Sequence, residues 1–233
     1  MPPRFPSFPR KVVALLALLC LPGNVWAQLK VEGTRLIYLG SDKEASINVI
    51  NRSSEETVMQ SWVSHPDHSG DIPFAIVQPL TMLPPRSHQM LRVLYAGQGL
   101  PTDRESMFWL NILEIPRKSE HADSIQFAVR QRLKLFYRPA GLQGSTSDAV
   151  RALQWHRYSQ RIEIRNPSAF HLSLVDLALE GPGLHEPLKD YVLLQPGASI
   201  TLNTRSPVPT GSRVTFTEIA DSGLLQSHTA SLP

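Results

Sequence analysis

The sequence predicts an all-β protein made of two β-sandwich domains. Short runs rich in β-branched and aromatic residues recur along the chain, as in 45–51, where Ile47 and Val49 alternate with polar residues. Clusters of Gly, Pro, Asn, Asp and Ser, which favour turns, separate these runs. A segment with little apolar character, 141–147, interrupts the pattern and is typical of a linker between domains.

The strand candidates fall into two groups on either side of this linker. Seven precede it, which is the number in a simple immunoglobulin-like sandwich. They are 33–39, 45–51, 57–63, 74–78, 88–96, 106–115 and 125–137. Those that follow are 153–158, 161–165, 171–179, 191–194, 199–203 and 213–219. We therefore expect an N-terminal immunoglobulin-like domain over 28–143 and a smaller β-sandwich over 144–233.

The N-terminus has the pattern of a secretory signal peptide over 1–27. Basic residues precede a short apolar run, 12–21, and 25–27 carries small residues where a signal peptidase reads. The run is about half the ~20 residues that span a bilayer, which disfavours a retained anchor. Lipid attachment at Cys20 is disfavoured because Leu19 stands where a small residue is needed. We expect cleavage after Ala27.

Removal of this segment changes what the composition implies. It carries three of the 23 basic residues and none of the 20 acidic ones, so the mature chain is formally neutral. Without a basic excess, no nucleic-acid partner is expected. The single cysteine also leaves with the segment, so the mature protein has no disulfide and must depend on burial for stability.

No constellation of residues indicates an enzyme. His65 and His68 stand three apart, but a proline and a glycine nearby favour a loop over a metal-binding helix. The chain lacks both a Gly-x-Ser-x-Gly elbow and a glycine-rich phosphate loop. We expect no catalytic activity, no metal and no cofactor.

The candidate strand 125–137 is unusually long, since strands average about 5–6 residues. Its apolar residues share one face: Ile125, Phe127, Val129, Leu133 and Leu135. This face either packs on the protein's own core or offers an apolar row to a partner. An exposed apolar strand promotes aggregation, so proteins keep one mainly where it binds something. The pattern alone leaves both interpretations open.

Four segments of the N-terminal half resemble the periplasmic chaperones of the chaperone–usher pathway. They are 34–38, 91–95, 100–111 and 133–142, and include Asp-Arg-Glu-Ser at 103–106 and Lys-Leu-Phe-Tyr-Arg-Pro at 134–139. The C-terminal half is similar more loosely, through 164–167 and 217–223. The short connection, 116–124, is similar to that of members that serve rod-like pili.

The resemblance implies two sandwich domains at an angle, with a cleft between them. It also implies a function: the long strand fills the groove of a pilus subunit that lacks its last strand, which is donor-strand complementation. By position, Ile125, Phe127 and Val129 are then the donor residues. Arg35 and Lys134 are the cleft residues that bind the C-terminal carboxylate of the subunit.

The resemblance further implies an ion-pair network between the domains, at Arg92, Glu105 and Asp221. The expected partners are pilus subunits and an outer-membrane usher, in the periplasm, with self-association through the donor strand when the chaperone is free. The competing hypothesis is a secreted immunoglobulin-like fibre subunit or adhesin. Such a protein should carry its own N-terminal donor extension, whereas little chain separates Gln28 from the first strand candidate.

Overall fold

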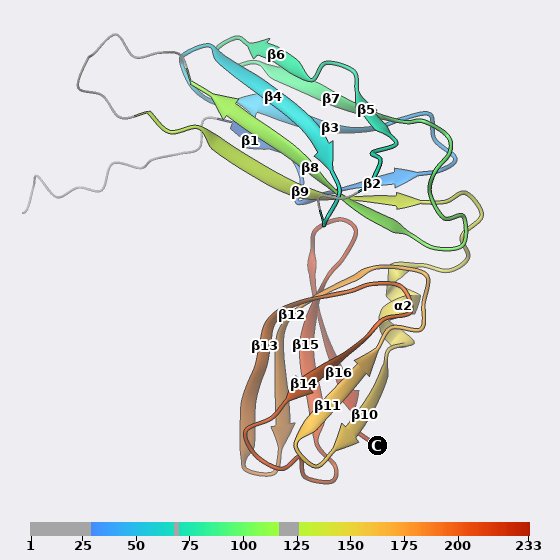
Figure 1. The fold of residues 1–233 in the computed structure, drawn as a ribbon. Coiled ribbons are helices and arrows are strands. Elements are labelled where there is room, and N and C mark those ends of the chain that lie inside the picture. Colours follow the sequence, from blue (N-terminus) through green and yellow to red (C-terminus); the bar gives the residue numbers. More distant parts are fainter. Residues whose placement is uncertain (1–28, 68–69, 117–125) are drawn as a thin grey trace, which may run out of the picture.

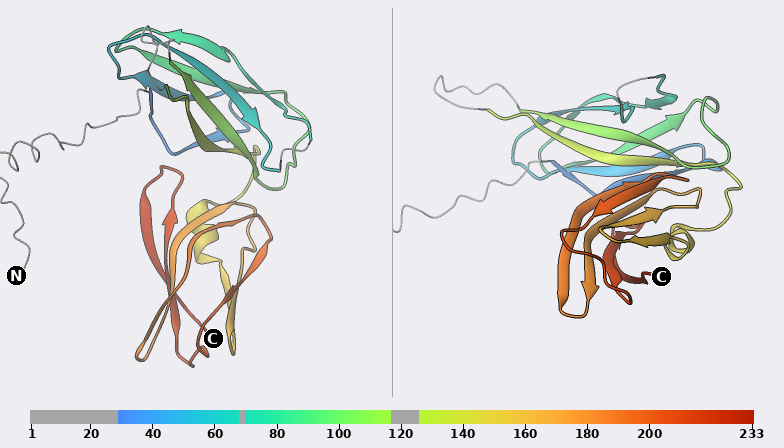
Figure 2. Two further views of the ribbon diagram at one scale, coloured as in Figure 1. Left: turned by 60° about the vertical axis from the view of Figure 1, so that its left-hand side comes forward. Right: turned by 60° about the horizontal axis from the view of Figure 1, so that its bottom comes forward.

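The computed structural model describes residues 29–67, 70–116 and 126–233, and it confirms the all-β fold class. The described residues form sixteen strands and one short helix, arranged as two β-sandwich domains (Figure 1). The two domains are set at an angle to each other, as the views in Figure 2 show.

Domain 1 consists of two sheets with the strand orders β1-β3-β7-β5 and β2-β9-β8-β4-β6. Its strands are β1 (Leu29–Val31), β2 (Arg35–Leu39), β3 (Ala45–Asn51), β4 (Thr57–Ser64), β5 (Phe74–Ile76), β6 (Leu80–Leu83), β7 (His88–Tyr95), β8 (Ser106–Ile115) and β9 (Val129–Arg138). A single apolar core, which includes Val49, Leu110 and Leu135, fills the space between the sheets.

Domain 2 pairs a sheet of order β10-β11-β14 with one of order β13-β12-β15-β16. Its elements are α2 (Thr146–Arg151), β10 (Gln154–Tyr158), β11 (Arg161–Arg165), β12 (Leu172–Gly181), β13 (Leu184–Leu194), β14 (Ser199–Asn203), β15 (Arg213–Ile219) and β16 (Leu225–Ser231). Its core is a separate cluster that includes Ile164, Leu174 and Val214.

Part of the predicted linker is helical. Ser145 caps α2 by accepting a hydrogen bond from the backbone N–H of Asp148 at 3.2 Å. Ala149 and Val150, just after the polar stretch, are buried in the core of domain 2. The end of the predicted linker therefore begins a helix, which packs through these two apolar residues.

Domain 1 is open at one edge because its first strand changes sheets. β1 pairs with β3, whereas β2 crosses to the other sheet and runs parallel to residues 134–138 of β9. Gly33 lies between β1 and β2, where the chain crosses from one sheet to the other, and has a φ of +146°. A Cβ at this position would lie 3.3 Å from the side chain of Ile47. In the described part of the chain, residues 129–133 of β9 consequently pair with β8 alone.

The β15–β16 hairpin of domain 2 reaches domain 1 beside β2. A Cβ at Gly223, in the turn of this hairpin, would lie 2.7 Å from Oγ1 of Thr34. The closeness leaves no room for a side chain, and the φ of +83° independently favours glycine. This contact places the end of β15 next to Arg35, the first residue of β2.

Candidate functional site

The structure brings the two predicted carboxylate-binding residues together. Arg35 of β2 and Lys134 of β9 are direct Cα partners in the parallel pair of strands. Both side chains extend to the junction with domain 2, where they contact β12, β13 and β15. The pair also lies where the free edge of β9 ends, because β2 occupies that edge from Lys134 onward.

Arg35 is held by an uncharged partner from domain 2. Its Nη1 donates a hydrogen bond to the backbone carbonyl of Ile219 at 2.7 Å, and its guanidinium lies 5.9 Å from the ring centre of Phe136. Its Nε is buried with no hydrogen-bond partner among the described residues. Burial lowers the pKa of Arg35, and the carboxylates farther off, Asp221 first among them, oppose that shift.

Lys134 also has only uncharged contacts. Its Nζ donates a hydrogen bond to Oγ of Ser173 at 3.4 Å and lies 4.7 Å from the ring centre of Tyr191. Burial, with a smaller contribution from neighbouring Arg35, lowers the pKa of Lys134 to about 8. Among the described residues, neither Lys134 nor Arg35 forms a salt bridge. Two partly buried cations without a counter-ion make a site that attracts a carboxylate.

The apolar face of the long strand is divided between two environments. Leu133 and Leu135 are buried in the core of domain 1, whereas Val129 is 39% exposed and Phe127 is 77% exposed. Ile125 lies outside the described residues. The strand was predicted to begin at 125, but β9 begins at Val129, opposite Glu114 near the end of β8. Only the part of this face around Leu133 and Leu135 thus packs on the protein's own core, and the part before it is exposed.

A second group of charges joins the domains through Arg138. This arginine lies 2.7 Å from the carboxylate of Glu105 and 3.0 Å from that of Asp221, which belongs to domain 2. Glu105 is buried and also accepts a hydrogen bond from the backbone N–H of His171 at 2.7 Å. Glu105 and Asp221 therefore meet as expected, on either side of one cation.

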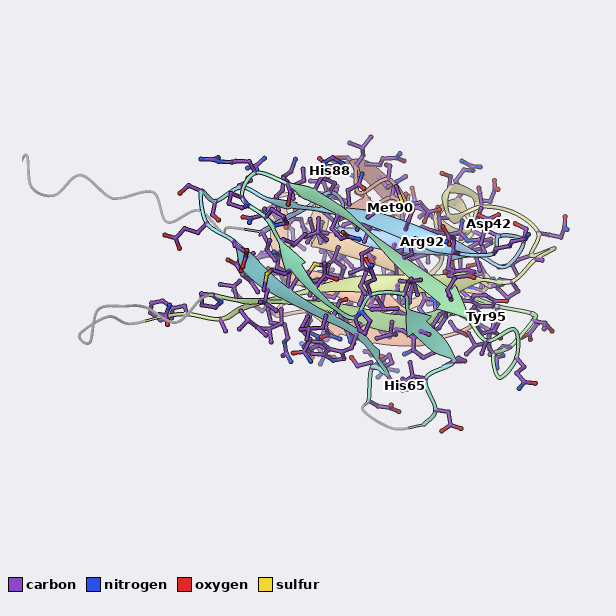
Figure 3. All side chains as sticks on the ribbon, turned by 90° about the horizontal axis from the view of Figure 1, so that it is seen from above. Asp42, His65, His88, Met90, Arg92 and Tyr95 are labelled. Atoms are coloured by element: carbon purple, nitrogen blue, oxygen red, sulfur yellow. The ribbon has the colours of Figure 1, made fainter. Side chains whose placement is uncertain are left out.

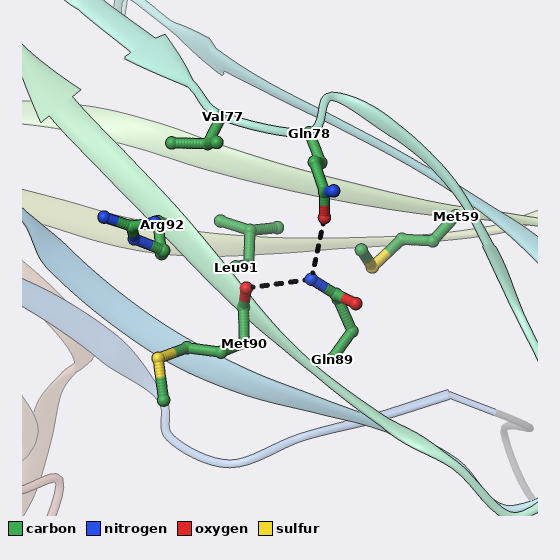
Figure 4. A pocket seen from close by; sticks show the side chains of 7 residues that line it. All are labelled: Met59, Val77, Gln78, Gln89, Met90, Leu91 and Arg92. Carbon is green, nitrogen blue, oxygen red and sulfur yellow. Dashed lines mark hydrogen bonds between the residues drawn. The ribbon is translucent and has the colours of Figure 1, made fainter.

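The prediction that Arg92 is the cation of this network was wrong. Arg92 lies on β7 (Figure 3), in the opposite sheet of domain 1. Its exposed side chain pairs with Glu44. It borders a pocket whose other side chains include Val77 and Gln89 (Figure 4). Strand alternation could have identified the right residue, because Arg138 shares a strand face with Lys134.

Comparison with known proteins gives the same result for both halves of the chain. The family described as pili and flagellar-assembly chaperone, PapD N-terminal domain, matches residues 28–143. The family described as pili assembly chaperone PapD, C-terminal domain, matches residues 148–230. The chain belongs to the PapD family of pili-assembly chaperones.

Individual relatives support this assignment. Chaperone protein LpfB of Salmonella typhimurium is 39% identical over 219 residues, which cover 91% of this chaperone and 90% of LpfB. The structure of the YadV chaperone has a TM-score of 0.78 at 30% identity, covering 88% of this chain and 100% of that one. The Salmonella enterica SafA pilin–SafB chaperone complex contains a chain with a TM-score of 0.75 at 26% identity, covering 90% and 97%.

Two further points concern the class of protein. Both matched families are families of pili-assembly chaperones. In the part of the chaperone that the structure describes, no helix is long and apolar enough to cross a membrane.

The Arg138 network predicts that Glu105→Ala strongly destabilises the chaperone. Loss of this carboxylate leaves Arg138 with one counter-ion instead of two and the N–H of His171 unpaired. Breaking a buried ion pair costs about 3–5 kcal/mol, which should lower the urea midpoint of unfolding. Arg92→Ala is the matched control: it removes an exposed pair and should leave the midpoint unchanged. Equal midpoints for the two variants would contradict the role of Glu105.

Proposed function

We propose that this chaperone acts in the periplasm, captures pilus subunits by donor-strand complementation and delivers them to an outer-membrane usher. The observation that carries the proposal is the continuity of two features: the free edge of β9 leads directly to the cation pair Arg35–Lys134. The predicted signal peptide supports a periplasmic location, and the family supports delivery to an usher.

The register of β2 indicates how a strand of the pilus subunit would lie. β2 and the incoming strand share one edge of β9, with β2 on residues 134–138 and the incoming strand beside 129–133. A strand parallel to β9 would direct its carboxyl end toward Lys134, where β2 begins. The free carboxylate would therefore stop at Arg35 and Lys134, and could accept a hydrogen bond from the unpaired Nε of Arg35.

The exposed apolar row supplies the second part of the interaction. Phe127 and Val129 are exposed on the free chaperone, and burial of a large apolar side chain contributes about 1.5–3 kcal/mol. Ile125 would extend the row, by the sequence pattern. Because side chains alternate along a strand, a shift by one residue would turn the wrong face to the pilus subunit. Anchoring the carboxylate at one end prevents that shift.

The competing hypothesis of a fibre subunit or adhesin is not favoured. Both halves of the chain match chaperone domains, over residues 28–143 and 148–230. A fibre protein would instead be expected to donate a strand from an N-terminal extension.

We expect Lys134→Ala and Arg35→Ala to fold normally but to lose the capture of pilins. Each removes charge-assisted hydrogen bonds to the carboxylate, which are worth about 1.5–3 kcal/mol, or roughly 10- to 100-fold in affinity. The double variant should be little worse than either single variant, since both residues bind one group. Circular dichroism checks the fold, and calorimetry with a peptide from the carboxyl end of a pilin measures affinity.

The same pilin peptide with a C-terminal amide is the control for this experiment. It should bind wild-type chaperone as weakly as the free acid binds Lys134→Ala. Equal binding of acid and amide to the wild type would exclude recognition of a carboxylate.

The apolar row predicts that Phe127→Asp abolishes capture without unfolding the chaperone. In the free protein the side chain faces solvent, whereas in the complex a carboxylate would enter an apolar pocket. The desolvation penalty is several kcal/mol, which corresponds to on the order of 100-fold or more in affinity. Ala128→Asp adds the same charge on the other face and should have much less effect. A protease-sensitive, insoluble Phe127→Asp protein would instead place Phe127 in the chaperone's own core.

Affinity should also depend on pH, through Lys134. Its pKa of about 8 means that the ammonium is charged below that pH, and a bound carboxylate favours the charged form. Affinity for the pilin peptide should therefore be constant up to about pH 7, fall as the pH rises through 8, and level off above the pKa of the complex. Lys134→Arg, which keeps its charge, should show no such fall between about pH 7 and 9.

A further inference from the structure

We infer that Tyr191 is a positioning residue for the carboxylate site: with Ser173, its ring holds the ammonium group of Lys134 in place without neutralising it. This role rests on the proposed function of Lys134, but it can be tested in the free chaperone. Tyr191 would act through the lysine and not through the pilin.

The geometry that supports this role comes from neighbouring strands of domain 2. Tyr191 of β13 pairs with Val175 of β12, and Ser173, two residues earlier on β12, projects from the same face of the sheet. The ring centre of Tyr191 lies 4.7 Å from Nζ of Lys134, and Oγ of Ser173 lies 3.4 Å from it. Ser173 is buried, whereas Tyr191 is 41% exposed.

The junction contains two cations of β9 that differ in their partners: Arg138 has carboxylate partners, whereas Lys134 has neutral ones. Arg138 is matched by the carboxylates of Glu105 and Asp221, so its charge is satisfied within the protein. Lys134 instead has a hydroxyl and an aromatic face, both neutral, and an aromatic face attracts a cation without removing its charge. The first arrangement joins the domains, and the second keeps a charge available for a ligand.

The environment of Lys134 makes such support necessary. The charged and titratable groups that face it are Arg35 on β2, which repels it, and the phenol of Tyr191 on β13. At the paired position on β8 stands Trp109, and β12 presents Ser173; neither is charged. Burial and Arg35 together lower the pKa of Lys134 to about 8, close to neutral pH. Without the ring, a larger share of the lysine would lose its proton near neutral pH.

The test compares Tyr191→Leu with Tyr191→Phe in the full-length mature chaperone. Titration of the lysine side chains by NMR gives the pKa of Lys134, with Lys134→Ala used for assignment. Tyr191→Leu should lower this pKa by between about half a unit and one and a half units, the range expected for a cation–π contact. Tyr191→Phe keeps the aromatic face and should retain the wild-type value. Ser173→Ala should also lower it.

Binding of the pilin peptide provides the second readout. A fall of about one unit in the pKa of Lys134 would reduce affinity at about pH 7.5 by about threefold and leave it nearly unchanged at about pH 6. An equal loss at both pH values would mean that Tyr191 does not act through the charge of Lys134 and would overturn the inference. So would an unchanged pKa of Lys134 in Tyr191→Leu. If wild-type chaperone does not distinguish the acid from the amide, the proposed function fails, whereas the NMR titration still decides the role of Tyr191.

Discussion

The central constraint in this structure is that two like charges lie side by side, partly buried, without a counter-ion among the described residues. Arg35 and Lys134 are adjacent because β2 pairs in register with β9, so the repulsion between them is built into the sheet. Burial opposes both charges, as the lowered pKa values of both residues indicate. The rest of the junction supports this arrangement: Ile219, Ser173 and Tyr191 provide neutral contacts that do not discharge either group.

These neutral contacts come from domain 2, so they require that the two domains keep a fixed arrangement. A different cation, Arg138, holds the domains together. Arg138, on the same face of β9 as Lys134, connects Glu105 with Asp221 and packs over Phe170. Glu105 adds backbone contacts to Ala169 and His171. Domain 2 is thus held against β9 next to the site, which keeps its carbonyl, hydroxyl and ring in reach of Arg35 and Lys134. Arg138 and Lys134 lie close together on β9, yet they have distinct partners.

The sequence was most informative where side chains alternate. The strands around Val49, Leu110 and Ile164 were predicted because each lies in a short run rich in β-branched and aromatic residues, and alternation supported the first. β1 and β6 were missed because three or four residues are too few to show alternation, and β16 because its sequence is mostly polar. α2 was missed because its capping serine resembles a linker residue.

The site residues were predicted from the family resemblance and not from the pattern. Arg35 and Lys134 are far apart in sequence, and only the parallel pairing of β2 with β9 makes them adjacent. The error at Arg92 has the same origin. Alternation within β7 does not show which sheet of domain 1 faces domain 2, so it could not exclude Arg92. Alternation along β9 would have pointed to Arg138, which shares a strand face with Lys134.

The way the site is distributed along the chain has a consequence for biogenesis. Arg35 comes from the first described strands and Ile219 from near the C-terminus, and the two domains have separate cores. Domain 1 can bury its own apolar residues before domain 2 is complete, but at that stage Arg35 and Lys134 lack their neutral supports. The environment of Arg35 and Lys134 is therefore complete only when both domains have folded and docked. If the proposed function holds, a truncated chain would display the apolar edge of β9 without a complete cation site, and the capture of pilins would depend on completion of the chaperone itself.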